Sequence, residues 1–294
     1  MKRLFLKGGV RTVVAGLAAA FVYSCCGSAH ASNVLDQKIV SETPVDGAFP
    51  LVTGEGTSPI MVDENDWAGV VRAVGDLQLD VERVTGKKPV VAAAANGAKY
   101  SVIVGTLGKS TLIDGLVSAG KLDVGDLKGK WESFVIATVA NPVAGVEQAL
   151  VIAGSDKRGT IYGIYELSEQ LGVSPWYWWA DVPPMKRAAA YILPGRYASG
   201  EPKVKYRGIF INDEAPCLTG WVKETYGTDY GDHRFYAQVF ELILRLRGNY
   251  LWPAMWDWSF YADDPLNSKV ADEMGVVIGT SHHEPMARNH QEWV

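Results

Sequence analysis

Polar and aromatic side chains gather at three points in the last third of this 294-residue sequence. They are Asn212-Asp213-Glu214, the tryptophan-rich stretch 252–258 and Ser281 to Glu284. Carboxylates can act as the acid and the base of a hydrolysis, and an indole ring can stack on the apolar face of a sugar. These residue types therefore indicate carbohydrate chemistry.

The third point carries two adjacent histidines and a glutamate, which raises the question of a metal site. On a strand, His282 and Glu284 share one face while His283 points to the other. Two ligands are fewer than a zinc site requires, so we predict no metal. The glycine-containing turn at 155–160 lacks the Lys-Ser/Thr pair of a phosphate-binding loop, and we predict no cofactor.

Each of the three points lies at the end of a predicted strand. Strands and helices are expected to alternate at 205–213, 234–248, 249–255, 267–275 and 276–282, with a long loop after the first strand. The three strands should be parallel. All strand ends of a barrel open on one face, whereas a doubly wound sheet binds ligands at a single switch point. We therefore predict the first three βα units of a truncated (β/α)8 TIM barrel over residues 200–294.

Upstream residues alternate between helical and strand patterns, which predicts an N-terminal α/β domain at 32–199. The helices are expected at 66–86, 110–120 and 159–172, and the strands at 100–108, 132–139 and 148–155. A segment rich in Pro, Gly, Ala and Ser, 181–202, marks the boundary with the barrel. A barrel takes about 250 residues, so we expect the sequence to be part of a longer protein.

The composition excludes several classes of protein. The net charge is −5 and there is no basic excess, so nucleic acid is not an expected partner. Of the three cysteines, only Cys217 lies outside the first 31 residues, so no disulfide framework is expected. We also expect no transmembrane segment, because the apolar run at 13–22 is too short to span a bilayer.

Residues 1–31 resemble a signal peptide. Basic residues precede the apolar run, and Ala29-His30-Ala31 forms a cleavage site. The sequence Val22-Tyr23-Ser24-Cys25 approximates a lipobox, which leaves open a lipid anchor through Cys25. In either case we expect an exported protein, periplasmic or secreted.

Four long blocks of the sequence closely resemble glycoside hydrolase family 115, the xylan α-1,2-glucuronidases. They are SDKRGTIYGIYELSEQLGVSPWYWWADVP (155–183), YRGIFINDEAP (206–216), FELILRLRGNYLWPAMW (240–256) and DEMGVVIGTSHHEPMARNHQEW (272–293). The resemblance extends from about residue 35 to the last residue. It implies an N-terminal α/β domain and a catalytic (β/α)8 barrel, followed in the family by helical and β-sandwich domains.

The resemblance implies an exported enzyme that removes glucuronic acid, or its 4-O-methyl form, from glucuronoxylan with inversion. The expected partner is a plant cell-wall polysaccharide or oligosaccharide, and the full-length protein is expected to form a homodimer through later regions. One alternative is a non-catalytic glycan-binding protein on the same fold. Another is a β-hexosaminidase-like enzyme, which would carry an Asp-Glu pair on a mid-barrel strand.

Inversion requires two carboxyl groups about 6.5 to 9.5 Å apart. Asp213 and Glu214 are neighbours that point to opposite faces of a strand, so they are not expected to form that pair. The resemblance places Asp213 in the substrate pocket and the general acid beyond residue 294. Glu284 is the second catalytic candidate, because its carboxylate could activate water or orient a histidine. Asn212 and Glu214 are expected to contact substrate. The alternative is that Asn212 and Asp213 only cap the following turn.

Further substrate contacts are expected from the second and third points. Trp256 aligns by resemblance with a pocket tryptophan, while Trp252 either stacks on the sugar or fills the barrel mouth. His282 and His283 suit the carboxylate of a uronic acid. Arg288 can clamp the same carboxylate.

Two aromatic features have competing interpretations. Trp258 is expected either to stack on sugar or to fill the barrel mouth. The cluster PWYWW at 175–179 is expected to pack between the two domains rather than to bind substrate.

Three further arginines, Arg207, Arg245 and Arg247, are candidate carboxylate clamps by charge. Arg245 and Arg247 are expected on a helix that faces away from the barrel mouth, which favours positions in solvent or in salt bridges for these two. Asp263-Asp264 should cap the helix that follows Pro265.

We predict that the 294 residues alone release no glucuronic acid from aldouronic acids, because three strands cannot close a barrel. The measurement is product release by the purified chain beside an Asp213→Ala control. Release that depends on Asp213 would contradict the prediction.

Overall fold

The computed structural model describes residues 32–33, 37–253 and 257–279. The chain divides into two units, residues 1–30 and 31–294, and every described residue belongs to the second. No helix in the described ranges is long and apolar enough to cross a membrane. Mixed sheets and helices confirm the predicted α/β class.

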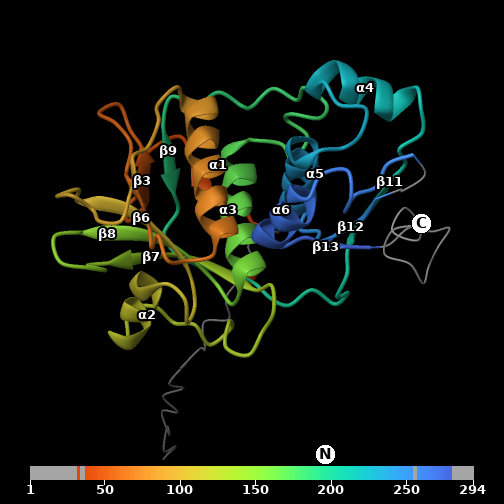
Figure 1. The fold of residues 1–294 in the computed structure, drawn as a ribbon. Helices are drawn as coiled ribbons and strands as arrows, with labels where there is room; N and C mark the ends of the chain where they lie inside the picture. Colours follow the sequence, from red (N-terminus) through yellow and green to blue (C-terminus); the bar gives the residue numbers. More distant parts are fainter. Residues whose placement is uncertain (1–31, 34–36, 254–256, 280–294) are drawn as a thin grey trace, which may run out of the picture. The chain divides into compact units, whose positions relative to one another are not determined.

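A seven-stranded sheet forms the centre of the N-terminal part (Figure 1). Its spatial order is β1 (Ser32–Asn33), β10 (Arg196–Ser199), β7 (Phe134–Ala140), β8 (Gln148–Gly154), β6 (Tyr100–Thr106), β4 (Ile60–Val62) and β5 (Val91–Ala92). From β8 to β5 the strands are parallel, while β7 is antiparallel to both neighbours. A small antiparallel sheet contains β2 (Val40–Ser41), β9 (Ala190–Ile192) and β3 (Phe49–Val52). Strands β9 and β10 lie within the predicted boundary segment 181–202.

Side chains alternate along the central strands and build two apolar layers. On β6, Val102 and Val104 belong to the core formed with helices α1 (Ala68–Thr85) and α3 (Lys157–Leu171), whereas Ile103 belongs to the core formed with α2 (Thr111–Ser118). Helices α1 and α3 therefore cover one face of the sheet, and α2 covers the other (Figure 1).

The predicted helices of this part form where their end signals stand. The Asp156 side chain accepts a hydrogen bond from Gly159 N at 2.8 Å at the start of α3, and Gly172 ends that helix in the left-handed conformation with φ of 106°. Ser110 caps α2 in the same way through Ile113 N. The expected strands at 100–108, 132–139 and 148–155 appear as β6, β7 and β8.

The C-terminal part forms a three-stranded parallel sheet in chain order. Strands β11 (Gly208–Ile211), β12 (Tyr250–Pro253) and β13 (Val277–Ile278) are neighbours in that order. Helices α5 (His233–Arg245) and α6 (Leu266–Met274) connect them. The predicted β-α-β-α-β alternation is confirmed. The strands are shorter than expected, and residues 280–282 of the third lie outside the described ranges.

The predicted long loop after the first of these strands is wrong, because helix α4 (Cys217–Tyr226) lies there and ends at Gly227. Sequence periodicity did not reveal α4 because Val222 is its only buried residue. A helix without an apolar stripe gives no helical hydrophobic pattern.

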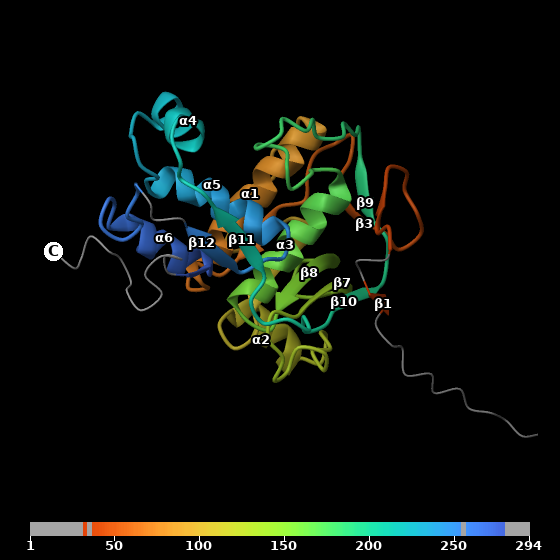
Figure 2. The ribbon, with the colours of Figure 1, turned by 90° about the vertical axis from the view of Figure 1, so that its right-hand side faces the viewer.

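The connecting helices join the two parts of the chain. Helices α5 and α6 share one apolar core with α1 and α3, in which Phe240 and Met274 pack in the same cluster as Val74 and Leu77. Figure 1 shows α5 and α6 between the β11–β13 sheet and the helices of the N-terminal part, and Figure 2 views the molecule from the side of that sheet, with β11 in the foreground. Both crossover helices therefore lie on one face of the three-stranded sheet.

Glu132 forms a buried polar junction at the amino ends of β11 and β12. Its carboxylate accepts from Arg158 Nε and Arg207 Nη2, each at 2.5 Å, and from Asn249 Nδ2 at 2.7 Å. The Asn249 Oδ1 atom in turn accepts from Arg207 N at 2.9 Å. The Glu132 side chain is fully buried, so these partners compensate a charge that would otherwise be costly to bury.

A second buried cluster forms between α1, α3 and α5 around Arg245. Its guanidinium contacts Asp80 and Glu241, both at 2.8 Å. It also lies over the rings of Tyr165 and Tyr177, at 4.5 and 4.9 Å from their centroids. The salt-bridged role predicted for Arg245 is thereby confirmed.

We predict that Glu132→Gln loosens the amino ends of β11 and β12, because it leaves Arg158 and Arg207 without their carboxylate. Breaking a buried ion pair costs about 3 kcal/mol, which should lower amide protection in residues 207–211 and 249–253 about a hundred-fold. Hydrogen–deuterium exchange followed by mass spectrometry measures this amide protection. The matched control is Glu147→Gln, whose exposed pair with Lys99 contributes little. Equal protection in both variants would refute the junction.

We also predict that Asp76→Asn stabilises the protein at pH 7.5 but not at pH 4. Burial raises the Asp76 pKa to about 6, and repulsion by Glu241 adds to the effect. The folded state therefore holds a proton that the unfolded state has lost above its lower pKa, so stability falls as pH rises through about 6. The penalty at pH 7.5 is about 3 kcal/mol, and urea unfolding at the two pH values measures it.

Asp63→Asn provides a control of opposite sign. Hydrogen bonds from Thr111 and Asn65 lower the pKa of Asp63 to about 2. Its contribution to stability is present above its unfolded pKa and is lost as pH falls through about 2, so Asp63→Asn should destabilise at pH 7.5. A stabilising effect of Asp76→Asn that does not change with pH would exclude the proposed cause.

Candidate functional site

Two of the three predicted polar points lie at the carboxyl ends of the neighbouring parallel strands β11 and β12, and the third, Ser281 to Glu284, lies outside the described ranges. Asn212 and Asp213 follow β11 directly, and Trp252 lies in β12. The Asp213 Oδ2 atom accepts hydrogen bonds from Asp257 N at 3.2 Å and Trp258 N at 3.1 Å. Asp213, at the end of β11, therefore fixes the loop that follows β12.

Asp213 is fully buried, while Asn212 and Glu214 on either side of it are exposed. Its backbone oxygen accepts from Thr219 Oγ1 of α4 at 2.6 Å. Asp213 therefore connects β11, α4 and the loop after β12. The alternative prediction was that Asp213 caps the turn after its own strand. The Asp213 carboxylate does accept hydrogen bonds from backbone amides, but Asp257 N and Trp258 N belong to the loop after β12.

Two titratable side chains near Asp213 have shifted pKa values. Burial raises the pKa of Asp263, with smaller contributions from Asp229 and Asp213. Burial also raises the pKa of Tyr236, and Asp213 adds to that effect. Asp213 therefore lies close enough to Asp263 and Tyr236 to influence both.

The tryptophans of the second point separate into two environments. Trp252 is 37% exposed, and its ring lies 5.6 Å from that of Phe210 in an edge arrangement. Trp258 is buried and packs edge-on to Phe235 at 5.7 Å. Of the two interpretations left open for Trp258, the structure supports packing.

The other predicted site residues fall outside the described ranges. They are Trp256, His282, His283, Glu284 and Arg288. Their roles remain predictions. Among the described residues, no group of three His, Cys, Asp or Glu side chains converges as metal ligands.

The arginines considered as carboxylate clamps have structural partners. Arg207 precedes β11 at the end opposite Asp213 and binds Glu132, so the clamp interpretation of Arg207 is wrong. Arg247 lies in the turn after α5, not in the helix, and pairs with Glu166 and Glu169. Both side chains hold elements together.

Sequence reasoning missed the cross-link between the starts of α5 and α6. Asp264 Oδ2 lies 2.7 Å from His233 Nδ1 and accepts from His233 N at 3.0 Å. Asp264 Oδ1 accepts from Leu266 N, the first residue of α6, at 2.9 Å, so the predicted capping role is confirmed for Asp264. It is not confirmed for Asp263, whose Oδ2 accepts from Ser259 N instead. The capping residue was visible in the sequence, but its second bond to His233 depends on how the helices pack.

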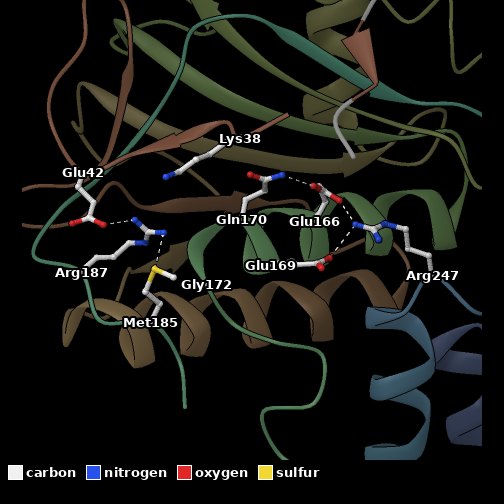
Figure 3. Close-up of a pocket in the computed structure, with 9 residues that line it drawn as sticks. All are labelled: Lys38, Glu42, Glu166, Glu169, Gln170, Gly172, Met185, Arg187 and Arg247. Atoms are coloured by element: carbon white, nitrogen blue, oxygen red, sulfur yellow. Dashed lines mark hydrogen bonds and ion pairs between the residues drawn. The ribbon is translucent and has the colours of Figure 1, made fainter. Parts of the chain in front are cut away.

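A cavity of about 390 Å³ lies elsewhere, beside α3 (Figure 3). In Figure 3, Glu42 and Arg187 face each other at 2.6 Å on one side, and Arg247 bonds to Glu166 and Glu169 on the other. These charges compensate one another. The cavity is therefore a charge-paired hollow in the N-terminal part and contains none of the predicted site residues.

The PWYWW cluster packs against the C-terminal part, as predicted. Tyr177 donates to Glu241 Oε1 at 3.0 Å, and Trp179 Nε1 donates to Gln238 O at 3.2 Å. Both partners lie on α5. The cluster therefore bridges the end of α3 to the helix before β12.

Comparisons with known proteins bear on this site. The model of glycosyl hydrolase family 115 matches residues 199–294, the segment that holds β11 to β13. No curated protein sequence matches the chain.

Solved structures extend the likeness. A family GH115 4-O-methyl-α-glucuronidase with specificity for decorated arabinogalactans, BtGH115A, is 36% identical with a TM-score of 0.68. The match covers 80% of this chain and 30% of that enzyme, so the chain spans less than a third of its length. A Streptomyces plicatus β-hexosaminidase is 11% identical with a TM-score of 0.45, over 79% of this chain and 42% of that one. A Flavobacterium johnsoniae chitobiase is 14% identical with a TM-score of 0.44, over 87% and 36%.

The family model covers the strands that carry the candidate site, and the 36% identical structure covers both parts of the chain. The resemblance read from the four sequence blocks is confirmed: residues 199–294 of this chain match glycoside hydrolase family 115, and a structure from that family is 36% identical over 80% of the chain.

Proposed function

We propose that the protein containing this chain removes glucuronic acid, or its 4-O-methyl form, from a polysaccharide. The observation that carries the proposal is the family match over residues 199–294, which contain Asp213 and Trp252 at the carboxyl ends of parallel strands. The 36% identical relative is a 4-O-methyl-α-glucuronidase. The whole protein, exported through the signal at 1–31, is the proposed enzyme.

We propose that β11 to β13 begin a (β/α)8 barrel completed by later residues. In support, each new strand joins the sheet beside the previous one, and α5 and α6 lie on the same face. A doubly wound sheet would reverse its strand order at a switch point. Exposed Ile209, Phe210 and Trp252 also leave apolar side chains for further barrel elements to cover.

The proposed chemistry is inverting hydrolysis. One carboxylate activates water and one carboxylic acid protonates the leaving oxygen, about 6.5 to 9.5 Å apart. Asp213 is the proposed catalytic carboxylate of the described residues, because it is buried at the strand ends and fixed by two backbone amides. Glu284 is the second candidate, and the general acid is proposed on a later strand.

The proposed sugar contacts surround Asp213. Trp252 and Trp256 offer indole faces to the pyranose, while exposed Asn212 and Glu214 can bond to hydroxyl groups. Their exposure beside a buried carboxylate supports a pocket open to substrate.

Cationic donors for the sugar carboxylate are proposed from the end of β13. His282, His283 and Arg288 supply imidazole and guanidinium groups that form charge-assisted hydrogen bonds. The proposed substrate is glucuronoxylan, and glucuronate-decorated arabinogalactan is the alternative that the relative's specificity suggests. We further propose a periplasmic or secreted location, with lipidation of Cys25 as a variant, and a homodimer of the whole protein.

A non-catalytic glycan-binding protein remains the competing function. The match to an enzyme family favours hydrolysis. Binding of glucuronoxylan without release of uronic acid from any substrate would favour the alternative.

We predict that the full-length protein releases glucuronic acid with the β configuration, and that Asp213→Asn lowers kcat at least about a hundred-fold. Proton NMR during turnover of aldouronic acids gives both rate and configuration. Asp272→Asn, an exposed carboxylate on α6, is the control and should leave kcat unchanged. Retained activity in a folded Asp213→Asn protein would remove Asp213 from the catalytic machinery.

A further inference from the structure

We propose that Trp221 on α4, with Trp178 and Trp179, forms a second carbohydrate-binding surface for the neutral pyranose backbone of the polysaccharide. This inference rests on the proposed function, because the backbone is the part of the substrate that is not removed. The surface lies outside the predicted pocket. Trp178 and Trp179 belong to the PWYWW cluster, which is predicted to pack between the two parts of the chain.

Three indole rings from distant parts of the chain meet here. Trp221 lies 5.7 Å from Trp179 with an angle of 36° between the rings, and 6.0 Å from Trp178 at 85°. The Trp221 ring is therefore tilted relative to Trp179 and nearly perpendicular to Trp178. The rings therefore make a corner rather than a flat stack.

The corner is anchored from below. The indole N–H of Trp179 donates a hydrogen bond to Gln238 O of α5 at 3.2 Å, and the ring packs edge-on to Phe235 at 6.1 Å between centroids. Phe235 is fully buried. Trp179 is thus a support whose position is fixed by the helix beneath it, and it holds Trp221 in place.

Trp221 itself is open to solvent. It is 39% exposed although the rings of Tyr226 and Phe235 also contact it, at 6.0 and 6.4 Å. The ring contacts fix Trp221 in place and still leave much of its apolar area open to solvent. A flat, rigid indole beside a second, perpendicular one presents an apolar face together with an N–H donor, which is the chemistry that a pyranose matches.

The charges near Trp221 favour a neutral ligand. Lys223 and Glu224, the nearest charged residues on α4, are opposite in sign and both exposed. Arg234 is engaged by Asp232 at 2.5 Å and by Tyr226 O at 2.8 Å. The surface therefore offers no net attraction to a uronate, unlike the proposed pocket.

The corner is continuous with the candidate site through α4. Thr219, two residues before Trp221, donates to Asp213 O at 2.6 Å. Residues two apart on a helix point to nearly opposite sides, and a helix with its side chains is about 10 Å across, so Trp221 and Asp213 flank α4 at a separation that an oligosaccharide can span. A chain whose uronate enters the pocket can therefore lay its backbone on the corner.

The test compares Trp221→Leu with Trp67→Leu in the full-length protein. Leu keeps apolar bulk but removes the flat ring. Trp67 is similarly exposed, at 43%, but it stands at the start of α1. Affinity electrophoresis in gels containing glucuronoxylan, carboxyl-reduced glucuronoxylan or arabinogalactan measures binding to each polymer, and kinetics on an aldouronic acid measures the pocket alone.

We expect Trp221→Leu to weaken binding to a polymer that retards the wild-type protein about ten-fold. The loss should be the same for glucuronoxylan and for its neutral, carboxyl-reduced form. KM should rise on the polymer and stay unchanged on the short substrate, with kcat unchanged on both. Trp67→Leu should behave as wild type, and Trp221→Phe, which keeps a flat ring, should recover most of the binding.

Two results would overturn the surface. One is a wild-type protein that none of the polymers retards, and the other is equal retardation of the Trp221→Leu and Trp67→Leu proteins. Absence of glucuronic acid release from every substrate would instead refute the proposed function, and retardation would still report on the corner independently. Circular dichroism and melting of each variant confirm that its fold is intact.

Discussion

One buried carboxylate, Glu132, sets the geometry on which the site depends. It binds Arg158 at the start of α3, Arg207 before β11 and Asn249 before β12. A buried charge is costly unless partners of this kind compensate it. The backbone of Glu132 adopts a left-handed φ of 52° at this position. The N-terminal part thus fixes the amino ends of strands that belong to the C-terminal part.

Fixing the amino ends leaves the carboxyl ends available for chemistry. Arg245 secures α5 on α1 from the side, and neither ionic cluster includes Asp213 or Trp252. The two ionic clusters and the candidate site therefore lie at different places along the β11–β13 sheet, as the proposed barrel requires. The N-terminal part is consequently a structural support for the site and, through Trp178 and Trp179, part of its proposed rim.

The sequence predicted features that depend on local signals. Asp156 and Gly172 marked the ends of α3, and the alternation of strands and helices after residue 200 was correct. Helix α4 was missed because it buries one residue and so lacks the apolar stripe that a helical pattern needs. The strands β2 to β5, of two to four residues each, were missed as well.

The prediction of the candidate site depends on strand order more than on residue type. Three polar strand ends implied a shared edge, and the structure places Asp213 against the loop after β12. The partners of Arg207, in contrast, come from residue 132 and from Tyr162, distances in sequence that no local pattern encodes. Charge alone therefore cannot separate a substrate clamp from a structural pair.

A crystal structure of the full-length protein with glucuronic acid bound tests the central claim most directly. The account predicts the sugar at the carboxyl ends of β11, β12 and β13, with its ring against a tryptophan of residues 252–256 and Asp213 within the same pocket. Glucuronic acid bound at the amino ends beside Glu132, or in a domain that lacks these strands, would contradict it.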